Sequence, residues 1–221
     1  GNTVDVVNYA SDKPWPENSA ATGKSIFLSK PSLDNNDGAN WQLSGYEHRT
    51  PGGYPVAKKV SGIFINECMG DNTVAVADES GEFDDWIELY NANDHAVDVG
   101  GLYLTDDASK KLRFKMTDSM PELTTIAPRG YLLVWADDDP SQGPLHANFS
   151  IAQSGEGVYL YQLSYSDTML IDELAVPKMT SNRSFGRYTD GTATTQEFVL
   201  STPGEANSTA GLIAGLYINE I

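Results

Sequence analysis

The sequence is poor in the side chains on which most enzymes depend. Its 221 residues include one cysteine, Cys68, and three histidines, His48, His95 and His146. A single cysteine excludes an internal disulfide. Three histidines scattered among turn residues give neither the ligand spacing of a zinc site nor the nucleophile and base of a catalytic triad, and there is no Gly-x-Ser-x-Gly segment. We therefore expect no catalytic site and no cofactor, with Cys68 as a buried, inert thiol.

Positive charge is also scarce, since 14 lysines and arginines face 31 aspartates and glutamates and the net charge is −17. Phosphate binding requires clustered bases, so nucleic acid is not expected as a direct partner. No apolar run approaches the length of a membrane span, and we expect no membrane insertion. We interpret Gly1 as a cleavage scar left after removal of an export signal. The hydrophobic content of 40% is enough for a packed core.

A motif recurs at a long interval. Thr50-Pro51-Gly52 precedes Ile65-Asn66-Glu67 by fifteen residues, and Thr202-Pro203-Gly204 precedes Ile218-Asn219-Glu220 by sixteen. Upstream, Gly23-Lys24-Ser25-Ile26 corresponds to Asn182-Arg183-Ser184-Phe185. Self-similarity at a fixed offset indicates a tandem module, here of about 150 residues.

The repeat predicts the domain organisation. Residues 1–54 would be the C-terminal half of a preceding module, and residues 55–62 a linker. Residues 63–207 would be a complete module, and residues 208–221 a linker with the first strand of a following one. Both partial modules would present unpaired strand edges, so we expect contact with neighbouring modules or strand-mediated self-association through Leu216–Ile221.

Short strands separated by turn residues dominate the pattern. Aromatic and branched residues gather at 63–65, 86–90, 102–104, 131–135 and 158–161, and Gly, Pro, Asn and Asp lie between them. The one helical candidate is a single turn near Pro121–Leu123. Alternation places Ile87, Leu89, Leu102, Leu104, Leu133 and Leu160 in the core. This pattern is typical of an all-β antiparallel sandwich or barrel.

An ordered series of motifs narrows the fold. The series comprises Ile65-Asn66-Glu67, Asp84-Asp85-Trp86-Ile87-Glu88-Leu89-Tyr90-Asn91, Gly101-Leu102-Tyr103-Leu104-Thr105-Asp106-Asp107, Ile126-Ala127-Pro128-Arg129-Gly130-Tyr131-Leu132-Leu133-Val134-Trp135, Asn148-Phe149-Ser150, Ser184-Phe185-Gly186-Arg187-Tyr188 with Asp190-Gly191, and Thr202-Pro203-Gly204-Glu205-Ala206-Asn207. In this order and spacing the chain resembles the bacterial lamin-tail domain over about Ile63–Asn207. Cys68 and Leu102 stand where that family usually has an aliphatic residue and a tryptophan.

The resemblance implies an immunoglobulin-like antiparallel β-sandwich. It also implies a non-catalytic interaction or spacer module of a larger secreted or cell-surface bacterial protein, attached to a protein or a surface ligand. The alternative function is a calcium-dependent ligand-binding domain, for instance for glycans, accessory to an exported hydrolase, nuclease or kinase-like domain.

The acidic loops suggest one metal, calcium, because calcium prefers oxygen ligands. The segment Leu33–Gly38 lacks the glycine position and the bidentate glutamate of an EF-hand loop. Two denser clusters supply the candidate ligands Asp78, Glu82, Asp84, Asp137 and Asp139. Loop acids more often only solvate a turn, and that alternative stays open here.

One strand carries the few bases. Lys111, Arg113 and Lys115 alternate with apolar residues. Charge on an edge strand commonly prevents unwanted strand pairing, and docking of an acidic partner is the second interpretation.

Overall fold

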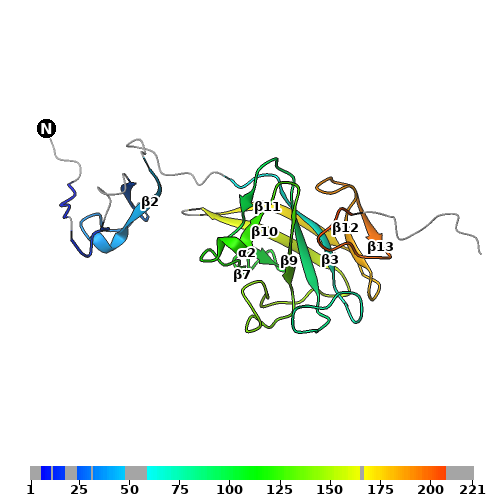
Figure 1. The fold of residues 1–221 in the computed structure, drawn as a ribbon. Helices are drawn as coiled ribbons and strands as arrows, with labels where there is room; N and C mark the ends of the chain where they lie inside the picture. The colour runs from blue at the N-terminus through cyan, green and yellow to red at the C-terminus, as the bar shows by residue number, and fades with distance from the viewer. Residues whose placement is uncertain are drawn as a thin grey trace, which may run out of the picture. The chain divides into compact units, whose positions relative to one another are not determined.

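The computed structural model describes residues 6–10, 12–17, 24–30, 32–47, 59–164 and 167–207. The chain divides into two compact units, one of Gly1–Lys58 with Ser164–Asp167 and one of Lys59–Leu163 with Thr168–Ile221 (Figure 1). Thr50-Pro51-Gly52, the first half of the linker expected at 55–62, and the segment 208–221 lie outside the described residues. The domain boundaries at 54, 62 and 207 therefore stay predictions.

The first unit is small and rests on aromatic packing. It contains β1 (Lys24–Leu28), the 3-10 turn η1 (Gly38–Asn40) and β2 (Trp41–Glu47), and β1 pairs antiparallel with β2. Trp15, 6% exposed, lies between Tyr9 and Trp41, with ring centroids 5.2 and 5.6 Å away.

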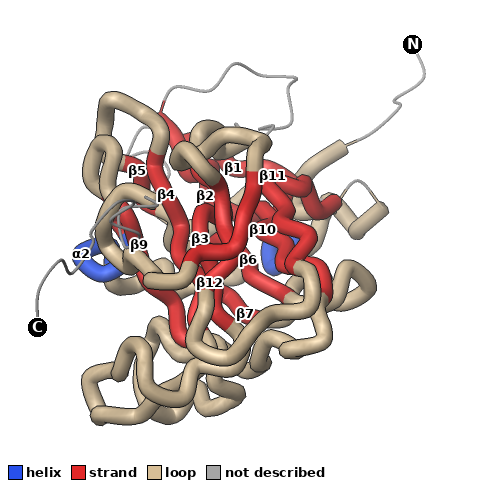
Figure 2. Tube along the Cα trace, turned by 90° about the vertical axis from the view of Figure 1, so that its right-hand side faces the viewer, coloured by secondary structure: helices blue, strands red, loops and turns tan. Residues whose placement is uncertain are grey.

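The second unit contains two larger sheets and a short ribbon. Its strands are β3 (Ile63–Met69), β4 (Trp86–Asn91), β5 (Val97–Asp98), β6 (Leu102–Thr105), β7 (Phe114–Lys115), β8 (Thr125–Ile126), β9 (Tyr131–Trp135), β10 (Glu156–Ser164), β11 (Asp167–Val176), β12 (Ser184–Arg187) and β13 (Thr195–Phe198). One sheet has the order β13-β12-β3-β4-β9, the other β11-β10-β6-β7, and β5 pairs with β8. The expected helical turn is α2 (Pro121–Thr124). Figure 2 shows strands and connecting loops as nearly the whole of the tube.

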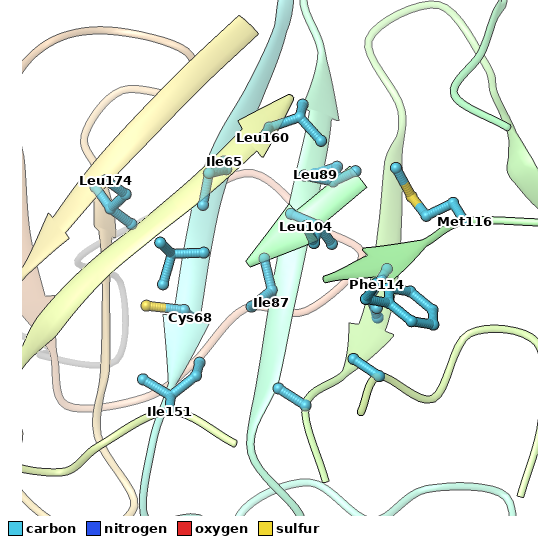
Figure 3. Packing of buried hydrophobic residues seen from close by; sticks show 14 of the residues in the cluster. Ile65, Cys68, Ile87, Leu89, Leu104, Phe114, Met116, Ile151, Leu160 and Leu174 are labelled. Carbon is cyan, nitrogen blue, oxygen red and sulfur yellow. The ribbon is translucent and has the colours of Figure 1, made fainter. Parts of the chain in front are cut away.

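The two sheets enclose one apolar core, as expected for an immunoglobulin-like sandwich. Ile65, Cys68, Ile87 and Leu89 of the five-stranded sheet face Leu104, Leu160 and Leu174 of the other (Figure 3). Five of the six predicted core residues are at most 3% exposed, namely Ile87, Leu89, Leu102, Leu104 and Leu160. The placement of the sixth, Leu133, in this core is wrong. In β9 the neighbouring Val134 points into the core, and Leu133 is partly buried against the separate cluster of Met69, Trp86 and Trp135.

Strand β3 contains a bulge that decides which side chains leave the core. Ile65 pairs with Leu89, but the register shifts before Glu67 pairs with Glu88 and Cys68 with Ile87. Without the extra residue, Ile65 and Glu67 would share a face, because side chains alternate along a strand. The bulge at Asn66 keeps Ile65 and Cys68 inside and turns Glu67 to the outer face.

Among the described residues, no helix combines the length and the apolar character needed to cross a membrane.

Candidate functional site

The outer face of the five-stranded sheet holds two glutamates directly opposite each other. Glu67 of β3 and Glu88 of β4 are cross-strand partners, and both are 0% exposed. Like charges in this position destabilise a sheet, so both carboxyls need either hydrogen-bond donors or protons.

Most of the donors come from a segment that returns over the sheet after β13. Glu67 accepts hydrogen bonds from the backbone N–H and the hydroxyl of Thr202, at 3.2 and 3.1 Å, and from the Ser184 hydroxyl. Glu88 accepts the N–H of Gly204 at 2.6 Å. The Thr-Pro-Gly motif is thus fastened to the first two strands of the unit.

A third acid and two asparagines complete this arrangement. Asp190 accepts hydrogen bonds from Asn66 at 3.1 Å, from the backbone N–H of Asn207 at 2.9 Å and from the Tyr131 hydroxyl at 2.6 Å. The Asn207 amide donates to the carbonyls of Asn66 and Arg187, at 3.2 and 2.8 Å. We call Asn66, Glu67, Glu88, Asp190, Thr202 and Asn207 the outer-face network.

Burial disfavours the ionised form of both glutamates. It raises the pKa of the Glu67 carboxyl, although hydrogen bonds from Ser184 and Thr202 oppose the change. It raises the pKa of Glu88 to about 8, and the charge of Glu67 adds to this effect. Glu88 is therefore mainly protonated at neutral pH, which relieves the repulsion between the two carboxyls.

Next to this network, one ion pair ties the two sheets together. Arg187 of β12 donates to both carboxylate oxygens of Asp172 of β11, at 2.9 and 3.0 Å, and the two side chains are 10% and 13% exposed. Its guanidinium also donates to the carbonyls of Ile65, Glu173 and Thr192. Gly186, just before it, must be glycine, because a Cβ there would lie 2.3 Å from the Asn66 carbonyl oxygen.

The candidate calcium ligands divide into two groups in the loops at one end of the sandwich. Asp78, Glu82 and Asp84 come together, each offering a ligand oxygen within 4.8 Å of the others; we call these three the loop carboxylate cluster. Asp139 instead caps its own turn, accepting from the N–H and hydroxyl of Ser141 at 3.1 and 2.6 Å. Asp137 binds His146. In Figure 1 the loops that follow β3 and β9 lie at the lower end of the second unit.

His146, which sequence reasoning set aside, is a buried ring between one buried acid and one exposed acid. Its ring is 1% exposed, Nδ1 faces Asp137, and Nε2 lies 3.0 Å from Glu79. Burial lowers the pKa of His146, but the hydrogen bonds to Asp137 and Glu79 outweigh burial, so the pKa is raised. Because both ring nitrogens face carboxylates, neither is available to accept a proton from a nucleophile.

Cys68 is 0% exposed, and desolvation raises the pKa of its thiol far above the ordinary value. The expected burial of this thiol is confirmed, and the raised pKa disfavours the thiolate, which is the reactive form.

The expected basic strand is wrong for Lys111 and Arg113, because β7 covers only Phe114–Lys115 and the chain turns before it. Two of the three bases are paired with acids. Lys115 pairs with Asp118 at 2.6 Å and Arg113 with Asp106, while the Lys111 ammonium lies 5.6 Å from the centre of the Tyr161 ring. An open groove of about 540 Å³ lies along Ser109–Arg113 and Thr168. Lys115, the one of these bases on β7, lies on an edge strand of its sheet and is paired with Asp118, which favours the edge-protecting interpretation over docking of an acidic partner.

Sequence reasoning missed the outer-face network, although two signals in the sequence could have found it. Asn66-Glu67 and Glu88 place polar residues inside otherwise apolar strand patterns, which predicts buried partners for them. His146 gave no such signal, because its partners Glu79 and Asp137 lie 67 and 9 residues away along the chain.

Two sheets enclosing one core, with an acidic outer face closed by a returning segment, define an immunoglobulin-like β-sandwich domain. The comparison with protein families agrees with this fold, since the lamin tail domain matches residues 57–177. The chain belongs to the lamin tail domain family, whose members are non-enzymatic, immunoglobulin-like domains of protein interaction. Searches of curated proteins and of solved structures found no match. The family match ends before β12, yet β12 and β13 complete the five-stranded sheet.

Proposed function

We propose that this chain is a non-catalytic interaction or spacer module of a larger secreted or cell-surface bacterial protein and that it mediates attachment to a protein or a surface ligand. The observation that carries the proposal is that the outer-face network fastens the end of the second unit to its first two strands. Its acids hold Thr202 and Gly204 against β3 and β4, and the Asn207 amide donates to the Asn66 carbonyl of β3. The first strand and the last described segment of the second unit are thereby held together, and a module in a series needs such fixed ends.

The side chains best suited to catalysis support the same proposal. Cys68 is buried, and both nitrogens of His146 are engaged by carboxylates. The catalytic part of the parent protein would then lie in other domains, and this chain would attach or space it.

Two measurements on the purified 221-residue chain test the proposal. A fluorescent fusion should bind saturably to the surface of cells of the source organism, and unlabelled chain should compete with it. Assays with ester, peptide, glycoside and phosphodiester substrates should show no turnover. Turnover that disappears in His146→Gln would overturn the proposal, and so would the lack of saturable binding.

Calcium-dependent ligand binding, for instance to surface glycans, is the second candidate function. It is favoured by two carboxylate oxygens of the loop carboxylate cluster that are buried without a hydrogen-bond partner. Under this alternative, chelation with EDTA would abolish binding to cells, whereas binding by a simple interaction module would persist.

Self-association is a separate part of the proposal. Within Leu216–Ile221, Ile218-Asn219-Glu220 repeats the Ile65-Asn66-Glu67 of β3, and such a strand could add to a neighbouring module. Light scattering over a range of concentrations should show oligomers that disappear when residues 216–221 are deleted. Identical masses for the two chains would rule strand exchange out.

A further inference from the structure

The loop carboxylate cluster differs from an ordinary acidic turn in what surrounds its oxygens. Asp78 is 9% exposed, and its Oδ1 accepts the N–H groups of Ser80 and Glu82 at 2.8 and 2.7 Å. Its Oδ2, however, is shielded from solvent and has no hydrogen-bond partner. The same is true of Oδ2 of Asp84. Buried carboxylate oxygens without partners are costly, and a bound cation would offset this cost.

A third unpartnered oxygen belongs to the same place. Gln142 donates its amide N–H to Glu82 at 2.9 Å, and its own Oε1 is buried without a partner. Carboxylate and amide oxygens, each without a donor, are the ligand types that hard cations such as calcium prefer.

The charge around the cluster is not balanced by the protein. No ion pair among the described residues includes Asp78, Glu82 or Asp84. His146, the nearest cationic candidate, is engaged by Asp137 and Glu79.

The spacing of the oxygens suits one ion. The three carboxylates offer oxygens within 4.8 Å of one another. Calcium binds oxygen at about 2.3–2.6 Å, so two ligands of one ion lie at most about 5 Å apart.

We propose that Asp78, Glu82 and Asp84 form a calcium site, with the amide oxygen of Gln142 as a fourth protein ligand. The ion would join the 78–84 loop to the loop that carries Gln142, two segments about 60 residues apart in the sequence. This proposal does not depend on the interaction-module function, although the calcium-dependent alternative depends on it.

The test compares melting curves of the 221-residue chain in calcium and in EDTA. Calcium at a hundredfold excess over its dissociation constant should raise the melting temperature by about 5–10 °C. Glu82→Gln and Asp84→Asn should each weaken calcium binding by at least about tenfold in calorimetry, the loss expected even for outer partners of a metal. Glu82 is exposed, so the first variant should fold normally.

Asp94→Asn is the matched control, because it removes one carboxylate from an exposed loop of the same unit. Its response to calcium should equal that of the unmodified chain. Terbium, which replaces calcium and is excited through tryptophan, should luminesce in the chain, since Trp86 lies two residues from Asp84. Calcium should displace this signal.

Three results would overturn the proposal. Coincident melting curves together with no heat of binding would remove the site. If calcium stabilised Glu82→Gln and Asp84→Asn as much as it stabilises the unmodified chain, the ion would bind elsewhere. Zinc binding stronger than calcium binding, and lost in His146→Gln, would assign the metal to the neighbouring group of Asp78, Glu79 and His146, whose ligand atoms also lie within 4.8 Å of one another.

Discussion

The second unit gathers acids in two places and treats them differently. In the outer-face network, the carboxyls of Glu67 and Glu88 are fully buried, and the chain supplies N–H and O–H donors to them. In the loop carboxylate cluster, Oδ2 of Asp78 and of Asp84 receive no donor. The first arrangement fastens one part of the chain to another, whereas the second is the calcium site that we propose. Whether a buried acid stabilises the fold or binds a ligand therefore depends on whether its oxygens receive hydrogen bonds from the chain or contact a bound cation.

The largest expected effect comes from placing a carboxylate where no donor exists. Leu89 and Glu88 are neighbours in β4, both 0% exposed, but on opposite faces of the sheet. Leu89→Asp should cost about 5 kcal/mol or more and prevent stable folding, because the apolar core offers no partner. Leu89→Met should cost less than about 1.5 kcal/mol. Thermal melting checks both, and an unchanged melting temperature for Leu89→Asp would refute the burial of this face.

The second prediction uses the pH dependence of the outer-face network. The pKa of Glu88 is raised from 4.5 to about 8 in the folded state, so the folded state binds this proton more tightly than the unfolded state. Its contribution to stability is full below pH 4.5 and is lost as the pH rises toward 8. The loss amounts to as much as about 5 kcal/mol, at about 1.4 kcal/mol per pH unit.

Glu88→Gln should remove this dependence, because glutamine stays neutral. Denaturant unfolding between pH 5 and pH 9 should show a variant that is slightly less stable than the unmodified chain at the acidic end and more stable at the alkaline end. Parallel pH profiles for the two chains would show that the pKa of Glu88 is the same in the folded and unfolded states.

The third prediction concerns the ion pair beside the network. Arg187→Met should cost about 3–5 kcal/mol, because Asp172 would remain buried without its cation. Arg183→Met is the control, since Arg183 and Glu197 are 39% and 37% exposed, and it should cost less than about 1 kcal/mol. Chemical denaturation of both variants gives the comparison. Equal losses would mean that the Arg187 pair adds nothing beyond a surface contact.

The smallest effect is expected in the loop carboxylate cluster without calcium. Asp84 has a raised pKa because of desolvation and four neighbouring acids, so its charge opposes folding at neutral pH. Asp84→Asn in EDTA should therefore raise stability by less than about 1 kcal/mol, since the site is partly solvated. The gain should disappear near pH 3, where Asp84 is protonated in both states. A loss of stability in EDTA would show that Asp84 is satisfied within the chain.

Much of the fold could be predicted because it follows from local pattern. Alternation placed Ile87, Leu89, Leu102, Leu104 and Leu160 correctly in the core. Leu133 was misplaced because β9 has apolar residues on both faces, and alternation cannot then tell which face meets the larger core.

The candidate site was less predictable. Acid density selected Asp78, Glu82 and Asp84, which the fold brings together, but it also selected Asp139, which caps a local turn. Composition shows that acids are present in a loop; it does not show where their oxygens point.

By itself, the sequence determined the class of the domain. Its strand periods, its turn residues and the order of its motifs specify a lamin tail sandwich, since these are properties of neighbouring residues. Only the tertiary structure decided which groups contact the acids. The bulge at Asn66 turns Glu67 toward Glu88, and the returning Thr202 closes over them from 135 residues away. The loop that carries Gln142 meets Glu82 in the same way. Such contacts join distant segments, and no local pattern records which segments will meet.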